Sequence, residues 1–403
     1  MFRSRHGVIT VGGLALACLM GSGAAAAQPD EHLRVPEGRV VPAADPIPGR
    51  YIVVLKDTAI PPRIVKSRVT SLVREYGGKV RHTYGSAIKG YAAEMSAAQA
   101  HRLAADPQVA FVEQDGTERI AETQPNPPSW GLDRVDQRNL PLNDRYTYPS
   151  TAADVSAYII DTGIQTTHEQ FAGRSRIGVD TVGDGRNGQD CHGHGTHVAG
   201  TLGGKDFGIA KQVDLIAVRV IGCGGTGPTS QIIAGVDWVT ANAVKPAVAN
   251  VSIRGSISAA KDEAFRKSIA AGITYVVGSG NDGRDACNYS PGHLPEALTV
   301  QNSTSADQRA STSNYGKCTD LFAPGTRITS AWIGTNTSTR TASGTSMATP
   351  HVGGAAALYL AAHPAATPAE VHAAVINSAT PGKVSNAGPG SPNRLLFINN
   401  PTS

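Results

Sequence analysis

The sequence is poor in charge and in aromatic residues. Charged residues make up 17% of the 403 residues and aromatic residues 5%, whereas soluble globular domains average about 25% charged residues. No basic stripe is present, which argues against nucleic acid as a partner. No uninterrupted apolar run reaches the roughly 18 residues that a membrane-spanning helix requires, so no membrane partner is expected. The 45 Gly and 25 Pro instead indicate a compact, loop-rich protein.

The small positive charge is confined to the beginning of the chain. The formal net charge is +4, but residues 121–403 hold 21 Lys and Arg against 21 Asp and Glu. A nearly neutral C-terminal part is expected to choose its substrates by the shape of a cleft more than by long-range charge.

The N-terminus is predicted to be an export signal, residues 1–27. Arg3 and Arg5 precede a Gly-interrupted apolar stretch at 7–20, and Ala25 to Ala27 supply small residues for cleavage. A buried core helix is the alternative. Lipidation of Cys18 is disfavoured because Ala15 stands where such signals prefer Leu. The protein is therefore expected to be secreted, into an oxidising compartment.

Cysteine is scarce, and its number is informative. Cys18 would leave with the signal, and an even set remains: Cys191, Cys223, Cys287 and Cys318. Four cysteines allow three disulfide connectivities. Four free thiols would require a reducing compartment, which contradicts an export signal.

The pattern predicts two folded parts after the signal. Residues 28–49 are polar and Pro-rich and are predicted to be a disordered leader. Residues 50–120 have the order β-α-β-β-α-β of a ferredoxin-like sandwich, with strands at 50–56, 80–84, 90–95 and 109–113 and helices at 61–76 and 97–105. The polar linker at 116–129 is a candidate cleavage zone.

Residues 121–403 are predicted to form an α/β domain. Buried strands are expected at 155–160, 215–220, 247–253, 274–277 and 298–300, and helices at 230–244, 261–271 and 345–363. This alternation predicts a parallel sheet covered by helices on both faces. Functional groups then belong at the carboxyl ends of the strands.

Three segments have the residue types of nucleophilic catalysis. Asp161 ends a predicted strand, His192, His194 and His197 lie among glycines, and Ser346 opens an apolar helix. Each has an alternative interpretation. Asp161 could only cap a turn, the three histidines could form a zinc site with Cys191, and Ser346 could only cap the helix. At a helix N-terminus, however, free N–H groups favour an oxyanion beside Ser346.

In the order Asp…His…Ser, these segments resemble the subtilase family. Segments similar to its proteinase K branch are 130–134, 234–239, 314–316 and 321–325, and the cysteine spacing resembles aqualysin-like bacterial members. Residues 50–115 resemble the inhibitory propeptide of such enzymes. The resemblance implies a subtilisin-like fold, a monomeric serine endopeptidase made as a precursor, and sequential disulfides, Cys191–Cys223 and Cys287–Cys318.

The resemblance also assigns roles to residues. Ser346 is the expected nucleophile, His194 its general base and Asp161 the residue that orients His194. Asn281 is expected to donate to the oxyanion, together with the Ser346 N–H group; taken alone, Asn281 also suits a simple turn. Catalysis needs no cofactor in this reading.

Protein or peptide substrates are expected to bind by strand addition. The resemblance places them between two edges, made by Gly225, Thr226 and Gly227 and by Ser252, Ile253 and Arg254, with Gly278, Ser279 and Gly280 lining the cleft. Arg254 departs from the family, which has Gly there. We expect Arg254 either to narrow the choice of substrate or to favour acidic neighbours. Gly278, where relatives often have Ala, is expected to deepen the pocket.

Structural calcium is expected by the same resemblance. Oxygen ligands suit Ca²⁺, and two candidate sets are present: Asp133, Asp136, Gln137 and Asn143, and the Pro295 and Ala297 carbonyls with Asp320. The alternative is that these acids form surface ion pairs.

The propeptide is expected to serve as an intramolecular chaperone and inhibitor. Parallel sheets fold slowly because their contacts are non-local, and a pre-formed partner lowers that barrier. Self-cleavage is predicted near residues 120–123. Three rivals remain: an inactive binding scaffold, an esterase, and a zinc peptidase that uses the histidine cluster. The order of the three residues, and the absence of Gly-x-Ser-x-Gly around Ser346, disfavour the esterase.

Overall fold

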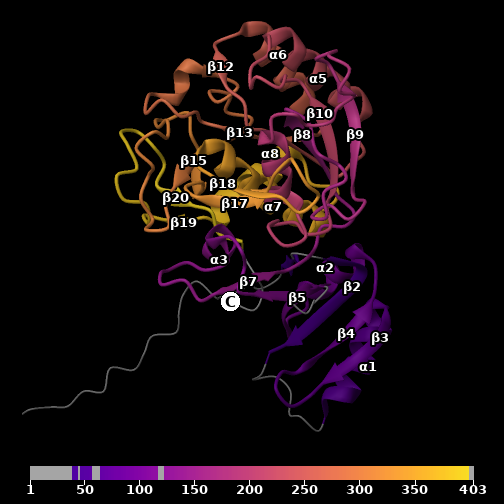
Figure 1. The fold of residues 1–403 in the computed structure, drawn as a ribbon. Helices are drawn as coiled ribbons and strands as arrows, with labels where there is room; N and C mark the ends of the chain where they lie inside the picture. The colour runs from indigo at the N-terminus through magenta and orange to yellow at the C-terminus, as the bar shows by residue number, and fades with distance from the viewer. Residues whose placement is uncertain (1–38, 44–45, 57–63, 117–121, 399–403) are drawn as a thin grey trace, which may run out of the picture. The chain divides into compact units, whose positions relative to one another are not determined.

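The computed structural model describes residues 39–43, 46–56, 64–116 and 122–398. The chain divides into two compact units between Thr117 and Glu118 (Figure 1). Each unit is described by itself. The predicted export signal and residues 117–121 of the candidate cleavage zone at 116–129 lie outside the described residues.

The smaller unit is a sheet with two helices packed on it. Its elements are β1 (Val40–Val41), β2 (Pro46–Leu55), α1 (Val65–Tyr76), β3 (Lys79–Tyr84), β4 (Gly90–Glu94), α2 (Ala97–Ala104) and β5 (Val109–Gly116). The strand order is β1-β5-β2-β4-β3. The pairings of β5 with β2, of β2 with β4 and of β4 with β3 are all antiparallel, as in a ferredoxin-like sandwich. One core, which includes Val53, Leu72, Tyr91 and Leu103, joins helices and sheet. The predicted fold of this part is confirmed.

The prediction of a disordered leader at 28–49 is wrong for residues 40–41 and 46–49. Residues 40–41 form β1, which pairs parallel with Val112 and Glu113 of β5, and β2 already begins at Pro46. Two adjacent valines complete the edge of the sheet, a pairing that is not visible in the local composition. Residues 28–38 lie outside the described residues.

The larger unit is an α/β domain. Its first half contains β6 (Glu122–Pro125), α3 (Trp130–Val135), β7 (Arg145–Tyr148), β8 (Ser156–Asp161), β9 (Ser175–Asp180), α4 (His194–Gly203), β10 (Asp214–Arg219), α5 (Thr229–Asn242) and β11 (Ala247–Val251). Its second half contains β12 (Gly255–Ser256), α6 (Ala259–Ala270), β13 (Thr274–Gly278), the 3-10 helix η4 (Ala286–Asn288), β14 (Tyr289–Ser290), β15 (Leu298–Ser303), β16 (Leu321–Pro324), β17 (Ile328–Ala331), β18 (Thr339–Ala342), α7 (Thr345–Ala362), α8 (Pro368–Ser378), β19 (Thr380–Pro381) and β20 (Arg394–Leu395).

A nine-stranded sheet organises this unit. Its order is β19-β20-β16-β15-β13-β11-β8-β10-β9, and every pairing is parallel except β19 with β20. One core cluster contains side chains of α4, α7 and α8, and a second contains side chains of α5 and α6 (Figure 1). Helices therefore cover both faces, and the predicted fold class is confirmed.

The register brings three strand ends to one edge of the sheet. Val251 of β11 is level with Ile160 of β8 and with Val277 of β13. The carboxyl ends of these neighbours, at Asp161, Val251 and Gly278, therefore lie side by side. This is the edge where parallel sheets bind ligands.

Three α-helices of this unit, α3, α4 and α8, were missed by sequence reasoning. Helix α4 contains Gly195, Gly200 and Gly203, which weaken any helical pattern. Helix α8 has a legible start, because Thr367 and Glu370 form a capping box.

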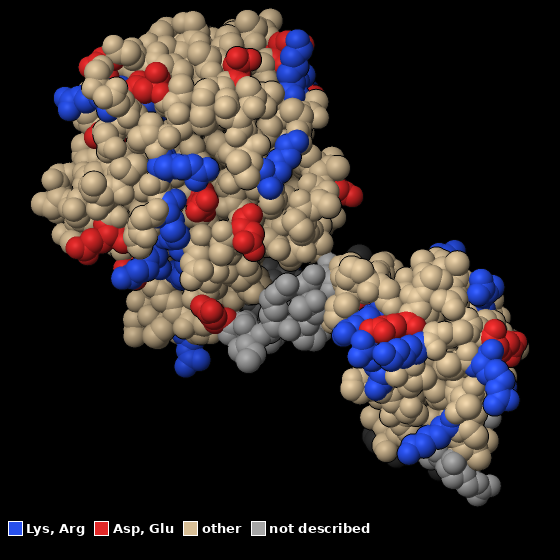
Figure 2. All heavy atoms as spheres, turned by 90° about the vertical axis from the view of Figure 1, so that its right-hand side faces the viewer, with Lys and Arg blue, Asp and Glu red and all other residues tan. Residues whose placement is uncertain are grey.

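Surface charge and hydropathy agree with the composition. On the face shown in Figure 2, Lys and Arg lie among Asp and Glu over the larger unit. Among the described residues, no helix has the length and apolar character to cross a membrane.

Candidate active site

Asp161 lies at the end of β8 with 1% of its surface exposed. Its Oδ1 atom accepts the Thr162 N–H at 2.7 Å and contacts His194 Nδ1, also at 2.7 Å. A buried carboxylate is costly unless it is paired, and these two donors supply that pairing. The contact fixes Nδ1 of His194 as the protonated nitrogen and leaves Nε2 as the basic one.

His194 is the first residue of α4. The next residue must be small, because a Cβ at Gly195 would lie 2.2 Å from the Gly163 oxygen. This close approach sets the start of α4 against the end of β8. Burial lowers the pKa of His194, but the Asp161 carboxylate raises it by more, so the pKa lies above its ordinary 6.5.

Asp190 organises the loop before α4, and sequence reasoning missed it. One oxygen accepts the Thr162 hydroxyl and the His192 and Gly193 N–H groups, each at 2.9 Å. The other oxygen accepts the N–H and hydroxyl of Thr196. The available signal was an Asp just before a turn of small residues, a common turn-former.

The other two histidines are placed differently from His194. His197 is buried, and its Nε2 lies 3.1 Å from the Ile328 and Arg340 oxygens. Burial lowers the pKa of His197 to about 4, so it stays neutral near pH 7. The ring of His192 stands edge-on to that of His194, with centroids 6.2 Å apart.

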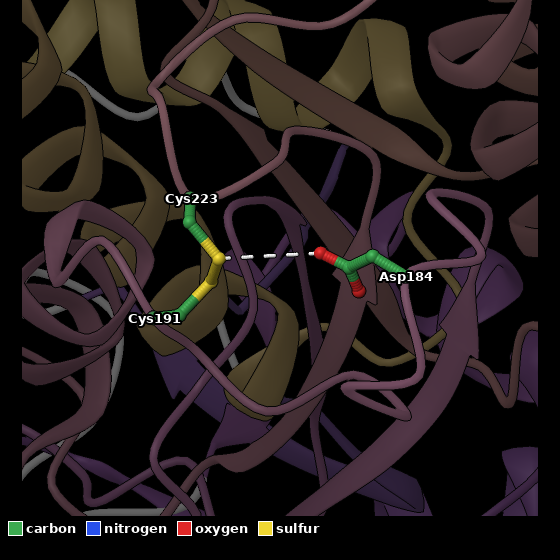
Figure 3. A group of neighbouring side chains, drawn as sticks. All are labelled: Asp184, Cys191 and Cys223. Carbon is green, nitrogen blue, oxygen red and sulfur yellow. Dashed lines mark hydrogen bonds between the residues drawn. A yellow bond between two sulfur atoms is a disulfide. The ribbon is translucent and has the colours of Figure 1, made fainter.

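The cysteine beside the histidine cluster is not free to bind zinc. Cys191 is joined to Cys223 in a disulfide, so neither sulfur is a thiolate. Among the described residues, the one group of three His, Cys, Asp or Glu side chains with metal-like spacing is this pair with Asp184 (Figure 3). The Asp184 carboxylate is paired with Arg219 at 2.6 and 2.8 Å instead. This group is not a metal site.

Both disulfides join the cysteines in sequential order, and Cys287–Cys318 is the second. The first ties the loop before α4 to the segment after β10. Beneath it, Arg219 is fully buried and paired with Asp180 and Asp184. Arg219 Nε also donates to the Thr162 oxygen at 3.2 Å, which links the disulfide region to the backbone beside Asp161.

Ser346 is the second residue of α7, at its N-terminus. Its hydroxyl donates to the Ser252 oxygen at 3.2 Å, and the Ser252 hydroxyl donates to the Ser346 oxygen at 3.1 Å. Ser346 is thus tied to the end of β11, while His194 is bonded at the end of the adjacent β8. Helices α4 and α7 also pack against each other.

Asn281 follows the end of β13 and contacts the residue before Ser346. Its Oδ1 atom accepts the N–H of Thr345 at 2.9 Å and the Thr345 hydroxyl at 3.2 Å. The carboxamide is thereby oriented, and its Nδ2 hydrogens face away from Thr345. Sequence reasoning missed Thr345, because nothing local indicates a contact 64 residues apart.

The predicted substrate-binding residues lie around this edge. Residues 252–254 continue β11 and residues 278–280 continue β13, so the two segments leave neighbouring strands. Residues 225–227 follow β10, and a Cβ at Gly225 would lie 3.0 Å from His192 Nε2. A Cβ at Gly278 would meet the hydroxyls of Thr345 and Thr349 at 3.2–3.3 Å. Gly278 therefore makes room for α7, and its effect on the depth of the pocket stays a prediction.

The first candidate calcium set has unsatisfied oxygens. Both Asp133 oxygens accept backbone N–H groups, from Asn143 and Asp144. Asp136 Oδ1 and Gln137 Oε1, in contrast, are buried without a partner. Burial raises the pKa of Asp136 to about 6, and the nearby Asp133 charge adds to this. The unpartnered oxygens of Asp136 and Gln137, together with the Asp133 carboxylate, fit a hard cation. Asn143 is shown only as a backbone donor.

In the second candidate calcium set, both carboxylate oxygens have protein partners. Asp320 Oδ2 accepts the Thr299 N–H at 2.7 Å, and Oδ1 lies 3.4 Å from His372 Nε2. Pro295 and Ala297 belong to the turn before β15. Because the Asp320 carboxylate already has protein partners, this set fits a cation less well than the first.

Comparisons with known proteins give consistent results. The model of the subtilase family matches residues 153–395, and that of the peptidase inhibitor I9 matches residues 50–121. The chain is 50% identical over 372 residues to the extracellular serine proteinase of Thermus sp. (strain Rt41A), covering 88% of this chain and 90% of that protein. It is 46% identical to the alkaline serine exoprotease A of Vibrio alginolyticus, covering 80% of this chain and 61% of that protein.

A solved structure is similar as well. It is that of a cold adapted subtilisin-like serine proteinase, with a TM-score of 0.66 and 48% identity. The match covers 67% of this chain and 98% of the other.

Proposed function

The chain belongs to the subtilase family of serine endopeptidases and includes an I9 inhibitor propeptide, and from this premise we propose that it hydrolyses peptide bonds through Asp161, His194 and Ser346. The observation that carries the proposal is the 2.7 Å contact between Asp161 Oδ1 and His194 Nδ1. It lies at the end of β8, next to the strand end to which Ser346 is bonded.

The first half of the reaction forms an acyl-enzyme. The Ser346 hydroxyl leaves the Ser252 oxygen, gives its proton to His194 Nε2, and its oxygen attacks the substrate carbonyl. Asp161 stabilises the imidazolium that forms. The tetrahedral oxyanion accepts hydrogen bonds from Asn281 Nδ2 and from the Ser346 N–H. His194 then returns the proton to the leaving amine, and the C–N bond breaks.

The second half repeats these steps with water. His194 removes a proton from the attacking water, whose oxygen adds to the ester carbonyl. His194 then returns that proton to the Ser346 oxygen as the ester bond breaks and the carboxylic product leaves. The residues needed are the same, and no metal takes part. Calcium, if bound, has a structural role.

Substrates are proposed to be proteins or peptides bound in extended form by backbone pairing. Residues 225–227 and 252–254 supply the two edges, and Ser279 and Gly280 line the cleft. The Ser279 oxygen is held by Asn314 Nδ2 at 2.9 Å, which supports a rigid wall on that side. We expect a monomer that binds neither nucleic acid nor membrane.

The chain is proposed to be a secreted precursor with four parts: a signal at 1–27, a leader at 28–49, an inhibitory propeptide at 50–120 and the peptidase at 121–403. The extracellular relative and the apolar N-terminus support secretion. The I9 match supports the inhibitory role of the propeptide.

Calcium is proposed to stabilise the segment around α3. Asp133, Asp136 and Gln137 would hold the ion through side-chain oxygens. The Asp320 set is the second candidate. Calcium bound to Asp133, Asp136 and Gln137 would neutralise buried carboxylates and fix the loop that ends at β7.

Casein hydrolysis tests the function against its rivals. A serine-directed sulfonyl fluoride should abolish the activity, and any loss with a chelator should be restored by calcium. Ser346→Ala should lose activity and should also leave the purified precursor uncut. Loss with chelator that only zinc restores would establish a zinc peptidase. Full activity in Ser346→Ala would refute the proposal.

A further inference from the structure

Arg254 lies two residues after Ser252, whose backbone oxygen is bonded to the Ser346 hydroxyl. Residues 279–281 follow β13, the parallel neighbour of β11. In the proposed function, on which this inference rests, residues 252–254 and 278–281 are the two walls of a slot that receives the side chain preceding the scissile bond.

The Arg254 side chain extends to the opposite wall. Its Nη2 atom donates to Asp282 Oδ1 at 2.6 Å, and its guanidinium carbon lies 5.0 Å from the centre of the Tyr289 ring. Its stem passes over Gly280, where a Cβ would lie 2.7 Å from Arg254 Cδ. Gly280 has a φ of +106°, and the absence of a side chain there is what lets the stem lie against the backbone.

Both ends of this connection are anchored. The Asp282 N–H is held by Asn314 Oδ1 at 2.9 Å, and Asn314 Nδ2 holds the Ser279 oxygen. The residue after Arg254, Gly255, pairs with Ser290 between β12 and β14. Cation–π contact with Tyr289 adds a third restraint on the guanidinium. Arg254 is therefore restrained from three sides, although 37% of its side-chain surface is exposed.

We propose that Arg254, held by Asp282 and Tyr289, is a specificity-determining residue that closes one end of the slot and limits the size of the side chain it accepts. We call these three residues the Arg254 strap. Because Asp282 compensates the guanidinium charge, the wild-type enzyme selects by size and not for acidic neighbours. This decides between the two effects that the sequence leaves open for Arg254.

The test compares peptides that differ only at the residue before the scissile bond: Ala, Leu, Phe, Gln and Glu. In Arg254→Ala, kcat/KM for Phe relative to Ala should rise about tenfold, the order by which pocket fit discriminates apolar side chains. The matched control is Arg266→Ala, which removes another exposed Arg–carboxylate pair, with Glu296. The control should keep the wild-type ratio. An unchanged ratio in active Arg254→Ala overturns the proposal.

A second variant separates size from charge. Asp282→Asn releases the strap but keeps the arginine, so the Phe-to-Ala ratio should rise as in Arg254→Ala. The uncompensated guanidinium of Asp282→Asn should also raise kcat/KM for the Glu peptide relative to the Gln peptide severalfold. Arg254→Ala should not show this change. A Glu preference already present in the wild-type enzyme, and lost in Arg254→Ala, would contradict the assignment by size.

Peptide binding tests the strap without hydrolysis. The same peptides are titrated into Ser346→Ala and into Ser346→Ala/Arg254→Ala. Loss of Arg254 should strengthen binding of the Phe peptide relative to the Ala peptide, as it should for kcat/KM. A wild-type protein that binds but does not cleave would refute the proposed function while leaving the strap supported. Active enzymes with identical ratios would refute the strap alone.

Discussion

His194 is the residue whose ionisation should govern the rate at acid pH. Only its neutral form accepts a proton from Ser346, so kcat/KM should rise with pH through the His194 pKa. Because Asp161 raises that pKa, we expect the half-maximal point above pH 6.5. Asp161→Asn should lower kcat about 10⁴-fold and move the remaining acid limb to lower pH.

The control for this pH profile is another Asp–His pair. Asp262 Oδ2 lies 2.8 Å from His293 Nε2, and neither residue belongs to the proposed catalytic set. Asp262→Asn should leave the acid limb where it is. An acid limb that does not move in Asp161→Asn would mean that a group other than His194 governs it.

Asn281 should matter for the chemical step and little for substrate binding. Asn281→Ala and Asn281→Asp should each lower kcat about 10²–10³-fold with similar KM. Asn281→Asp keeps an oxygen for the Thr345 N–H, so its thermal midpoint should stay nearer the wild type than that of Asn281→Ala. A loss of less than tenfold in both would remove Asn281 from the oxyanion site.

At this scale the sequence predicts some residues and misses others. Asp161, His194, Asn281 and Ser346 stand in short motifs whose residue types suggest their chemistry. Thr345 and Asp282 act through contacts with residues 64 and 28 positions away. Which segments meet is decided by the order of strands in the sheet, and that order cannot be read from spacing.

At the scale of elements, the two disulfides should stabilise equally but affect activity differently. They join residues 32 and 31 positions apart, so loop-closure entropy gives each about 3–4 kcal/mol of unfolding free energy. Paired Cys→Ala substitutions in a Ser346→Ala background should show this loss in denaturant unfolding. In active enzyme, only removal of Cys191–Cys223 should lower kcat/KM, because that bond holds the loop before α4. Equal losses of kcat/KM would contradict this assignment.

Calcium should act through the segment between α3 and β7. In a Ser346→Ala background, which avoids self-digestion, calcium should raise Tm and a chelator should reverse it. At 100 times Kd the stabilisation is about 2.7 kcal/mol. Asp136→Ala should remove most of the calcium-dependent rise, whereas Asp320→Ala should keep most of it. The opposite pattern would move the ion to the second set.

In the larger unit, strands β8, β10, β11, β13 and β15 and helices α5, α6 and α7 were the predictable elements. Apolar runs such as 247–251 are buried on both faces, which makes their pattern clear. Helix α4 and strand β1 depend on packing more than on local pattern. The first is rich in glycine, and the second is two residues at the edge of a sheet.

For the whole molecule, the uneven charge of the sequence gains an interpretation. The excess positive charge belongs to parts proposed to be removed, and the remaining peptidase has 21 residues of each sign. On the face shown in Figure 2, the charges of the larger unit are mixed. Selection of substrates by cleft shape, as the Arg254 strap implies, is consistent with this balance.

The central claim is that Ser346 is a nucleophile activated by His194. The most direct measurement is intact-protein mass spectrometry, with peptide mapping, after treatment with a serine-directed sulfonyl fluoride. The account predicts one adduct, on Ser346, that forms in step with loss of casein hydrolysis and becomes far slower in His194→Ala. An adduct at another residue, or inactivation without modification of Ser346, would contradict it.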